Sequence, residues 1–248
     1  MHNDESNKNK IPLINKKLTV IPPIIVILID QIMGALRDEI KKLREDFIKG
    51  TLTDTAAKAD PFEQFELWLG QAMEAKVPEV QATTLSSVSI EGKPSSRIVY
   101  IREFENNKFW IYTNYNSRKA KELMHNGNVS LTFFWPELER QIRIEGIAKK
   151  AEKEKSDTYF NARPRESQIG AWASNQSSVL KNRDELEAAV ENIRKKFEGK
   201  DVPRPDFWGG FEIEANYYEF WQGRKSRLHD RISYTLEKEK WTIKRLAP

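Results

Sequence analysis

The sequence predicts a mainly β fold with helical decorations (α+β), in which antiparallel strands form a closed or split β-barrel. Short segments rich in β-branched and aromatic residues follow one another through turn sequences, which is typical of antiparallel sheets. Helical segments are inserted between these strands, and no glycine-rich phosphate loop follows any of them. The pattern therefore does not indicate a Rossmann sheet.

Composition favours a folded protein with a sizeable core. Of 248 residues, 39% are hydrophobic and 31% are charged, which suits one large domain or two small ones. The 41 basic residues are interleaved with 37 acidic ones, so a local anion site is favoured over a nucleic-acid surface. The absence of cysteine excludes disulfide frameworks and thiol nucleophiles and fits a cytoplasmic location. The three histidines are far apart, so we expect no metal site.

Residues 1–32 are expected to be an extension outside a single domain at 33–248. The apolar run at 18–29 is too short for a helical membrane span, which needs about 20 residues, and Pro22 and Pro23 interrupt it. Three interpretations stay open: a disordered or loosely docked extension, a poorly formed signal peptide, or non-native sequence before a chain that begins at Met33. We expect no membrane association.

The helices follow from apolar periodicity and capping residues. Apolar positions spaced by four and three residues predict an amphipathic helix over 33–48: Leu36, Ile40, Leu43 and Phe47. Asp60, followed by Pro61 and Glu63, predicts the start of a helix that runs to about Lys76. Further predicted helices lie at 117–126, at 152–173 in two pieces broken at Pro164, and at 183–198.

The strands follow from β-branched and aromatic runs between turn residues. A hairpin is predicted around the turn at 91–94. The predicted strands are 80–90, 95–104, 108–113, 128–135, 140–152, 207–215, 217–223, 227–237 and 241–247. The last four are expected to form a meander.

Without a glycine-rich loop, side chains must hold any phosphate group, and arginine offers a bidentate fork for it. Basic and hydroxyl side chains gather in three places: Arg97 with Arg102, Ser117 with Arg118 and Lys119, and Arg163 with Arg165 and Ser167. Cations at a helix N-terminus oppose the helix dipole unless an anion lies between them and the amides. Together the clusters favour an anionic ligand over a solvated basic surface.

The stretch EFWQGRKSRLHDR, residues 219–231, places three potential cations at alternating positions. In an extended chain, Arg227, His229 and Arg231 would point to one side. Taken alone, they could face water, acidic neighbours, nucleic acid or an anionic small molecule.

In order, these segments resemble the FMN-dependent pyridoxamine 5′-phosphate oxidases, also called pyridoxine 5′-phosphate oxidases. The resemblance runs from about Arg44 to Pro248, and EFWQGRKSRLHDR is its most specific part. RPRESQIGAWASNQSS, SRKA, LERQ, FWGGF and RLAP are similar too. The resemblance implies an FMN-binding split β-barrel and a homodimer with FMN between the subunits. It also implies oxidation of pyridoxamine or pyridoxine 5′-phosphate to pyridoxal 5′-phosphate, with O₂ as acceptor and H₂O₂ released.

The resemblance implies which residues contact the cofactor and the substrate. The FMN set is Arg97, Ile98, Val99, Tyr100, Ile101, Arg102, Tyr112, Thr113, Arg118, Lys119, Gln141, Gln176, Ser177, Trp221 and Arg231. The substrate set is Arg44, Arg102, Tyr159, Arg163, Ser167, Arg227 and His229. Arg227 and His229 match the catalytic positions beside the reacting carbon, where His229 would add a polar or proton-accepting contact.

Two departures and two rival functions remain. Arg102 stands where the family more often has lysine, and Phe47 stands where it usually has tyrosine, so phosphate affinity and closure over the site are open. One rival is a split barrel that binds flavin or pyridoxal phosphate without oxidase activity. The other is a nucleic-acid-binding barrel that stacks bases on its aromatic residues.

Overall fold

The computed structural model describes residue 32, residues 35–43 and residues 46–248. Residues 46–248 form one compact unit, and residues 35–42 of the preceding unit are helical. Met33 and Arg44 lie outside the described residues. The helix predicted over 33–48 is wrong at its end, because residues 46–48 are not helical. Phe47 instead packs its ring edge-on against Trp221 and His229, with centroids 5.6 and 5.4 Å away.

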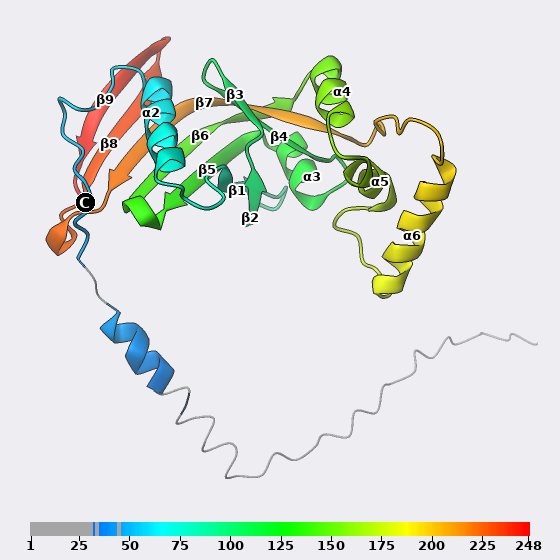
Figure 1. Cartoon of the computed structure of the whole chain (residues 1–248). Helices are drawn as coiled ribbons and strands as arrows, with labels where there is room; N and C mark the ends of the chain where they lie inside the picture. The colour runs from blue at the N-terminus through cyan, green and yellow to red at the C-terminus, as the bar shows by residue number, and fades with distance from the viewer. Residues whose placement is uncertain (1–31, 33–34, 44–45) are drawn as a thin grey trace, which may run out of the picture. The chain divides into compact units, whose positions relative to one another are not determined.

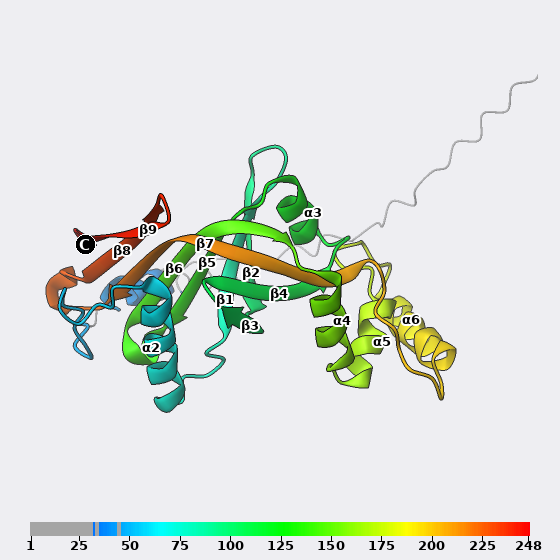
Figure 2. The ribbon, with the colours of Figure 1, turned by 90° about the horizontal axis from the view of Figure 1, so that it is seen from above.

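Within the described part of the chain, nine strands form one antiparallel sheet that curls into a half-barrel (Figures 1 and 2). Along the sheet the order is β2-β1-β5-β6-β7-β4-β3, and β8 joins β7 to β9. The strands are β1 (Ala82–Val88), β2 (Pro94–Tyr100), β3 (Glu103–Glu105), β4 (Lys108–Asn114), β5 (Asn128–Trp135), β6 (Arg140–Lys150), β7 (Trp208–Gln222), β8 (Asp230–Glu237) and β9 (Lys240–Leu246). The predicted mainly β fold with helices is confirmed.

The helices begin where the capping residues predict. Asp60 accepts hydrogen bonds from the amides of Phe62 and Glu63 at 2.7 and 3.1 Å, and the Ser117 hydroxyl accepts one from the Ala120 amide. The helices are α2 (Pro61–Glu74), α3 (Arg118–His125), α4 (Lys153–Asn161), α5 (Arg165–Ala173) and α6 (Arg183–Lys196), with short 3-10 turns η1 (Pro136–Leu138) and η2 (Lys225–Arg227). In the described residues, no helix combines the length and the apolarity that a bilayer crossing needs.

The strand predicted over 95–104 is broken into β2 and β3. The Ile101 amide still donates to Gln81, whereas the Arg102 amide donates to Trp110 of β4. The chain therefore exchanges one neighbouring strand for another at this point, which a hydrophobic pattern does not reveal. Arg102 lies at the crossover, outside regular strand pairing.

The two strands predicted at 207–215 and 217–223 are one continuous strand, β7. Ala215 pairs with Gly146 and Tyr217 pairs with Glu145, so Asn216 is an unpaired bulge residue. A Cβ atom on Gly146 would collide with the carbonyl oxygen of Glu214. The bulge lets β7 pair with β4 along its first half and with β8 along its second.

The strand predicted over 227–237 begins later, at Asp230. Ser226 and Arg227 have φ angles of 55° and 62°, which an extended strand does not allow. Arg227 therefore belongs to η2, His229 to the loop after it, and Arg231 to β8. The prediction that these three side chains alternate along one strand is therefore wrong.

The main core lies between α2 and the sheet. Phe65 of α2 contacts Phe109 and Phe133 with ring centroids 5.1 and 5.5 Å apart, and Trp68 contacts Phe220 at 5.3 Å. Burial of each such ring stabilises the fold by about 1.5–3 kcal/mol relative to exposure. A second apolar cluster, which includes Phe160 and Trp208, packs the helices α4, α5 and α6 against the start of β7.

Candidate functional site

A cleft of about 590 Å³ opens between β2, β4, α4 and α5. We call it the β4 cleft. The predicted site residues that line it are Ile98, Val99, Tyr100, Arg102, Tyr112, Thr113, Lys119, Tyr159, Arg163, Ser167 and Gln176. The fold thus gathers residues from five separate segments around one opening. Ile101, another predicted cofactor residue, does not line the cleft, because its side chain is buried in the main core.

Parallel aromatic rings form one wall of the β4 cleft. Tyr112 stacks on Tyr159 with centroids 3.7 Å apart, and Tyr159 is parallel to Trp208 at 6.2 Å. The guanidinium group of Arg163 lies over the Trp208 ring, 4.5 Å from its centroid. Arg102 lies over the ring of Tyr100 at 4.8 Å. Both arginines are therefore held by aromatic faces.

Arg163 has a hydrogen-bond donor without a partner. Its Nη1 atom is buried and makes no hydrogen bond to any residue that the structure describes. Burial lowers the pKa of Arg163, and nearby Arg102 lowers it further. An unsatisfied buried donor costs about 1–3 kcal/mol, which a bound anion would recover. This arrangement fits a phosphate group better than an apolar ligand.

The N-terminus of α3 forms a second group of donors beside the cleft. Lys119 Nζ donates to Thr113 Oγ1 at 3.1 Å, and that hydroxyl donates to Gln176 Oε1 at 2.9 Å. The Arg118 amide donates to Ser177 Oγ at 3.2 Å. Burial lowers the pKa of Lys119, and the charge of Arg97 adds to this effect. Two neighbouring sets of hydrogen bonds thus bring together five predicted cofactor residues, which we call the α3 network.

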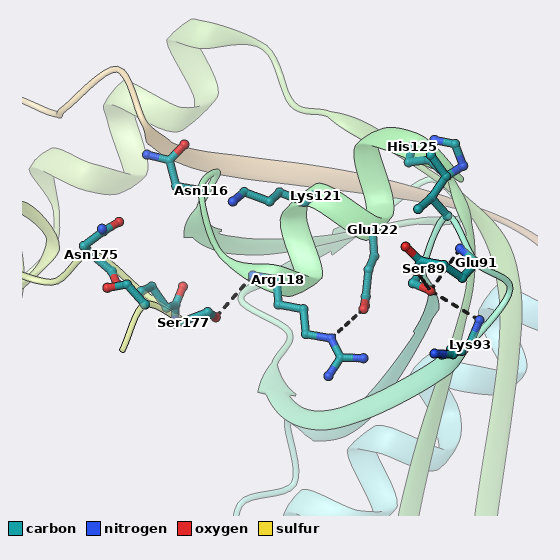
Figure 3. A pocket seen from close by; sticks show the side chains of 13 residues that line it. Ser89, Glu91, Lys93, Asn116, Arg118, Lys121, Glu122, His125, Asn175 and Ser177 are labelled. Carbon is teal, nitrogen blue, oxygen red and sulfur yellow. Dashed lines mark hydrogen bonds and ion pairs between the residues drawn. The ribbon is translucent and has the colours of Figure 1, made fainter. Parts of the chain in front are cut away.

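A second hollow of about 810 Å³ continues past Arg118 and Gln176. Figure 3 shows Arg118 and Glu122 extending side by side from α3, joined through Arg118 Nε, with Ser177 next to the start of that helix. Arg97 does not line the β4 cleft or the second hollow. Its two terminal amino groups donate to Ser87 and Ser95 at 2.6 and 2.5 Å. Glu122 is not among the predicted site residues, although its position four residues after Arg118 was the available signal.

The remaining predicted residues form another group, the β8 cluster: Gln141, Trp221, Arg227, His229 and Arg231. Gln141 pairs with Trp221, and Trp221 pairs with Arg231, so these three side chains share one face of the sheet. Arg231 Nε donates to buried Glu219 at 2.9 Å. Glu219 is a second residue that sequence analysis missed, although it lies within the 219–231 stretch.

His229 lies against Trp221, with ring centroids 4.6 Å apart. Its Nδ1 atom accepts a hydrogen bond from the Arg224 amide at 3.1 Å. Burial lowers the pKa of His229, and the charge of Arg227 lowers it further. The neutral ring therefore carries its proton on Nε2 and presents a donor there. Of the two contacts expected of His229, polar or proton-accepting, this tautomer suits the polar one, through the Nε2 donor.

The β4 cleft and the β8 cluster lie at opposite ends of β7. Trp208 lines the cleft at the first residue of this strand, and Trp221 is the second-to-last residue. Thirteen residue-to-residue steps along the strand separate them by roughly 40 Å, at about 3.3 Å per step. Figure 2 shows β7 running from α4 and α5 at one end to β8 and β9 at the other. One chain cannot place both groups around one small ligand.

Comparisons with known proteins find relatives of this chain along most of its length. Residues 69–197 match the sequence model described as pyridoxamine 5′-phosphate oxidase, and residues 208–248 match the pyridoxine 5′-phosphate oxidase C-terminal dimerisation region. The chain is 46% identical to a pyridoxine/pyridoxamine 5′-phosphate oxidase of Leptospira biflexa, over 85% of this chain and 100% of that protein. It is 48% identical to the same enzyme of Bordetella pertussis, over 84% and 99%.

Solved structures show the same fold. PhzG from Burkholderia lata, in complex with tetrahydrophenazine-1-carboxylic acid, superposes with a TM-score of 0.75 at 28% identity, over 80% of this chain and 98% of that chain. An FMN-binding protein from Nostoc punctiforme superposes with a TM-score of 0.61 at 13% identity, over 77% and 100%. With both sequence models and relatives of nearly equal length in agreement, the chain belongs to the pyridoxamine 5′-phosphate oxidase family.

Proposed function

We propose that this chain is an FMN-dependent oxidase that converts pyridoxamine or pyridoxine 5′-phosphate to pyridoxal 5′-phosphate, with O₂ as acceptor and H₂O₂ as by-product. The observation that carries the proposal is Arg163, which lines the β4 cleft and whose buried Nη1 donor has no partner among the described residues. Arg102, Tyr159 and Ser167 line the same cleft. Two cations, a phenol and a hydroxyl suit a phosphate monoester.

The α3 network fits the phosphate group of FMN. The Nη1 and Nη2 atoms of Arg118 make no hydrogen bond within the described residues, and this side chain is 62% exposed. Lys119 and the hydroxyl of Ser177 lie beside it. We assign Arg118, Lys119, Gln176 and Ser177 to that phosphate. The bound flavin would accept a hydride from the substrate carbon that bears the amine or hydroxyl.

The side chains of this protein would position the substrate and supply donors. Holding the substrate by its phosphate group fixes the position of the distant reacting carbon. This lowers the entropic part of the activation barrier. Arg227 and the Nε2 donor of His229 would contact the pyridine substituents. Arg231, held by Glu219, would place a cation beside the polar edge of the cofactor.

A homodimer would bring the two groups together. The β4 cleft of one subunit would face the β8 cluster of its partner, because a single chain holds them roughly 40 Å apart along β7. Ile98, Tyr100 and Phe134 support this, since they leave 63, 40 and 57% of their surface exposed on strands of one sheet. Exposed large apolar side chains gathered on a sheet face are typical of a protein interface.

The test is an oxygen-uptake assay on the FMN-loaded protein. Pyridoxamine 5′-phosphate and pyridoxine 5′-phosphate should each drive O₂ consumption and pyridoxal 5′-phosphate formation, and at least one should do so rapidly. Unphosphorylated pyridoxine is the matched control and should react far more slowly, because it lacks the group that Arg163 binds. A yellow protein without substrate-dependent uptake would favour the rival flavin-binding function. A colourless protein that retains RNA would favour the nucleic-acid rival.

A further inference from the structure

A buried carboxylate lies behind the proposed phosphate-binding side chains. Glu122 of α3 is only 5% exposed and accepts four hydrogen bonds. Its Oε2 atom accepts from the hydroxyls of Ser87 and Ser95 at 2.5 and 2.7 Å and from Arg97 Nη2 at 3.2 Å. Its Oε1 atom accepts from Arg118 Nε at 2.8 Å. One side chain thus joins β1, β2 and the start of α3.

The ion pair between Arg118 and Glu122 has the less favourable order for stabilising the helix that carries it. Arg118 is the first residue of α3, where the helix dipole disfavours a cation, and Glu122 lies in the second half, nearer the negative end. Pairs of this spacing are more favourable when the acidic residue comes first. The reversed order therefore needs another explanation, and the contacts of Glu122 offer one.

Glu122 fixes the direction in which Arg118 points. The carboxylate binds Nε, on the inner edge of the guanidinium plane, and so leaves Nη1 and Nη2 directed outward into the hollow of Figure 3. A planar fork held in this way can bind two oxygens of one phosphate group. Arg97 is held by the same carboxylate and by both serines, which keeps the β1–β2 hairpin against α3.

The charges also match a phosphate monoester. Two net positive charges remain near the proposed phosphate site, because three cations (Arg97, Arg118 and Lys119) surround one carboxylate, Glu122. A phosphate monoester carries about −1.5 to −2 charges at pH 7. Burial alone would raise the pKa of Glu122, but the hydrogen bonds from Ser87, Ser95 and Arg118 and the charge of Arg97 lower it to about 2. The carboxylate is therefore ionised throughout the working pH range.

We propose that Glu122 is a positioning residue for the cofactor phosphate: it orients Arg118 directly and braces the β1–β2 hairpin through Arg97. This proposal rests on the proposed binding of FMN at the start of α3. It assigns a role in anion binding to a residue that itself carries a negative charge.

The sign of the effect separates positioning from simple electrostatics. By Coulomb's law alone, removal of a carboxylate beside an anion site should tighten phosphate binding. If Glu122 orients Arg118, its removal should instead weaken phosphate binding, because the guanidinium fork loses its fixed direction. Riboflavin has the same ring system as FMN without the phosphate, so its affinity reports on the rest of the site.

The experiment measures FMN and riboflavin dissociation constants by flavin fluorescence in the full-length protein freed of cofactor. We expect Glu122→Gln to weaken FMN binding by about tenfold or more, the size of a lost charge-assisted contact, and to leave riboflavin binding nearly unchanged. Glu91→Gln is the matched control, because Glu91 lines the same hollow and its side chain accepts a hydrogen bond only from Ser89 among the described residues. That variant should bind FMN like the unchanged protein, or slightly more tightly.

Unchanged or tighter FMN binding by Glu122→Gln would overturn the positioning role, as would an equal loss for FMN and riboflavin. If that variant does not fold, Ser95→Ala decides, because Ser95 links Arg97 to Glu122 without carrying charge. It should weaken FMN binding selectively, and unchanged FMN binding would overturn the proposal. If the unchanged protein prefers riboflavin to FMN or binds neither, the proposed function itself fails, which is a distinct outcome.

Discussion

Arg163 has the clearest individual role among the proposed site residues, because its Nη1 donor is buried and has no partner in the described part of the chain. Replacement by alanine should raise the KM for pyridoxamine 5′-phosphate about tenfold to a hundredfold, since a hydrogen bond to a charged group contributes about 1.5–3 kcal/mol. FMN affinity should change little. Steady-state oxygen uptake and flavin titration measure the two effects.

Arg163→Lys provides a graded comparison, because lysine keeps the charge but lacks the planar fork. Its KM should lie between those of the unchanged protein and Arg163→Ala. A KM that stays the same in the alanine variant would remove Arg163 from the substrate site.

His229 should titrate below its ordinary pKa of 6.5, because burial and the charge of Arg227 disfavour its protonated form. The folded state then binds a proton less readily than the unfolded state does. The stability that neutral His229 contributes is complete above pH 6.5 and is lost as the pH falls from 6.5 to the folded-state pKa.

An NMR titration of the His229 ring measures this pKa directly. Arg227→Ala removes one of the two causes and should move the pKa of His229 back upward. A pKa at or above 6.5 in the unchanged protein would contradict the described environment of the ring.

Sequence reasoning found most site residues because their identities carry the chemistry, but it could not see Glu122 or Glu219. A carboxylate within a basic segment resembles a solvated surface residue until its hydrogen bonds are known. Burial of Glu122 depends on Ser87 and Ser95, which approach it from strands more than 25 residues away in the chain. The same limit applies to Arg97, whose terminal amino groups are engaged inside the protein.

At the scale of elements, helices were predicted well because their caps are local, as Asp60 and Ser117 illustrate. Strand ends were predicted less well because they depend on distant partners. The break before β3 occurs where Arg102 leaves one neighbouring strand for another, and the unity of β7 depends on a bulge opposite Gly146. Neither event has a local sequence signal.

Gly146→Ala should destabilise the sheet, because the added Cβ atom would collide with the backbone carbonyl of Glu214. Overpacking of this kind costs about 1–3 kcal/mol. Thermal unfolding should show a Tm lower by several degrees, at roughly 2–4 °C per kcal/mol for a domain of this size.

Gly70→Ala is the matched control, because a Cβ atom there meets no atom of the described residues within 4 Å and the position lies on the exposed side of α2. It should raise the free energy of unfolding by up to about 1 kcal/mol, the helix propensity difference between the two residues. Equal Tm values for the two variants would contradict the described packing at the bulge.

At the scale of the whole molecule, the separation of the β4 cleft from the β8 cluster has the largest consequence. The alternation of Arg227, His229 and Arg231 suggested one shared face, whereas the structure divides them among a turn, a loop and β8. The distance between the two groups arises from the length of β7, so no local motif reports it. It is also the observation on which the proposed two-chain site rests.

Subunit complementation tests this composite site most directly. Arg163→Ala damages the β4 cleft and Arg227→Ala damages the β8 cluster, so each variant alone should have low activity. In a randomly mixed population of two-fold symmetric dimers, half of the molecules carry both chains, and each of these contains one intact site. Pyridoxal 5′-phosphate formation should therefore recover to about a quarter of the unchanged activity after the two variants are unfolded and refolded together. Activity that stays at the level of the separate variants would contradict a site shared between subunits.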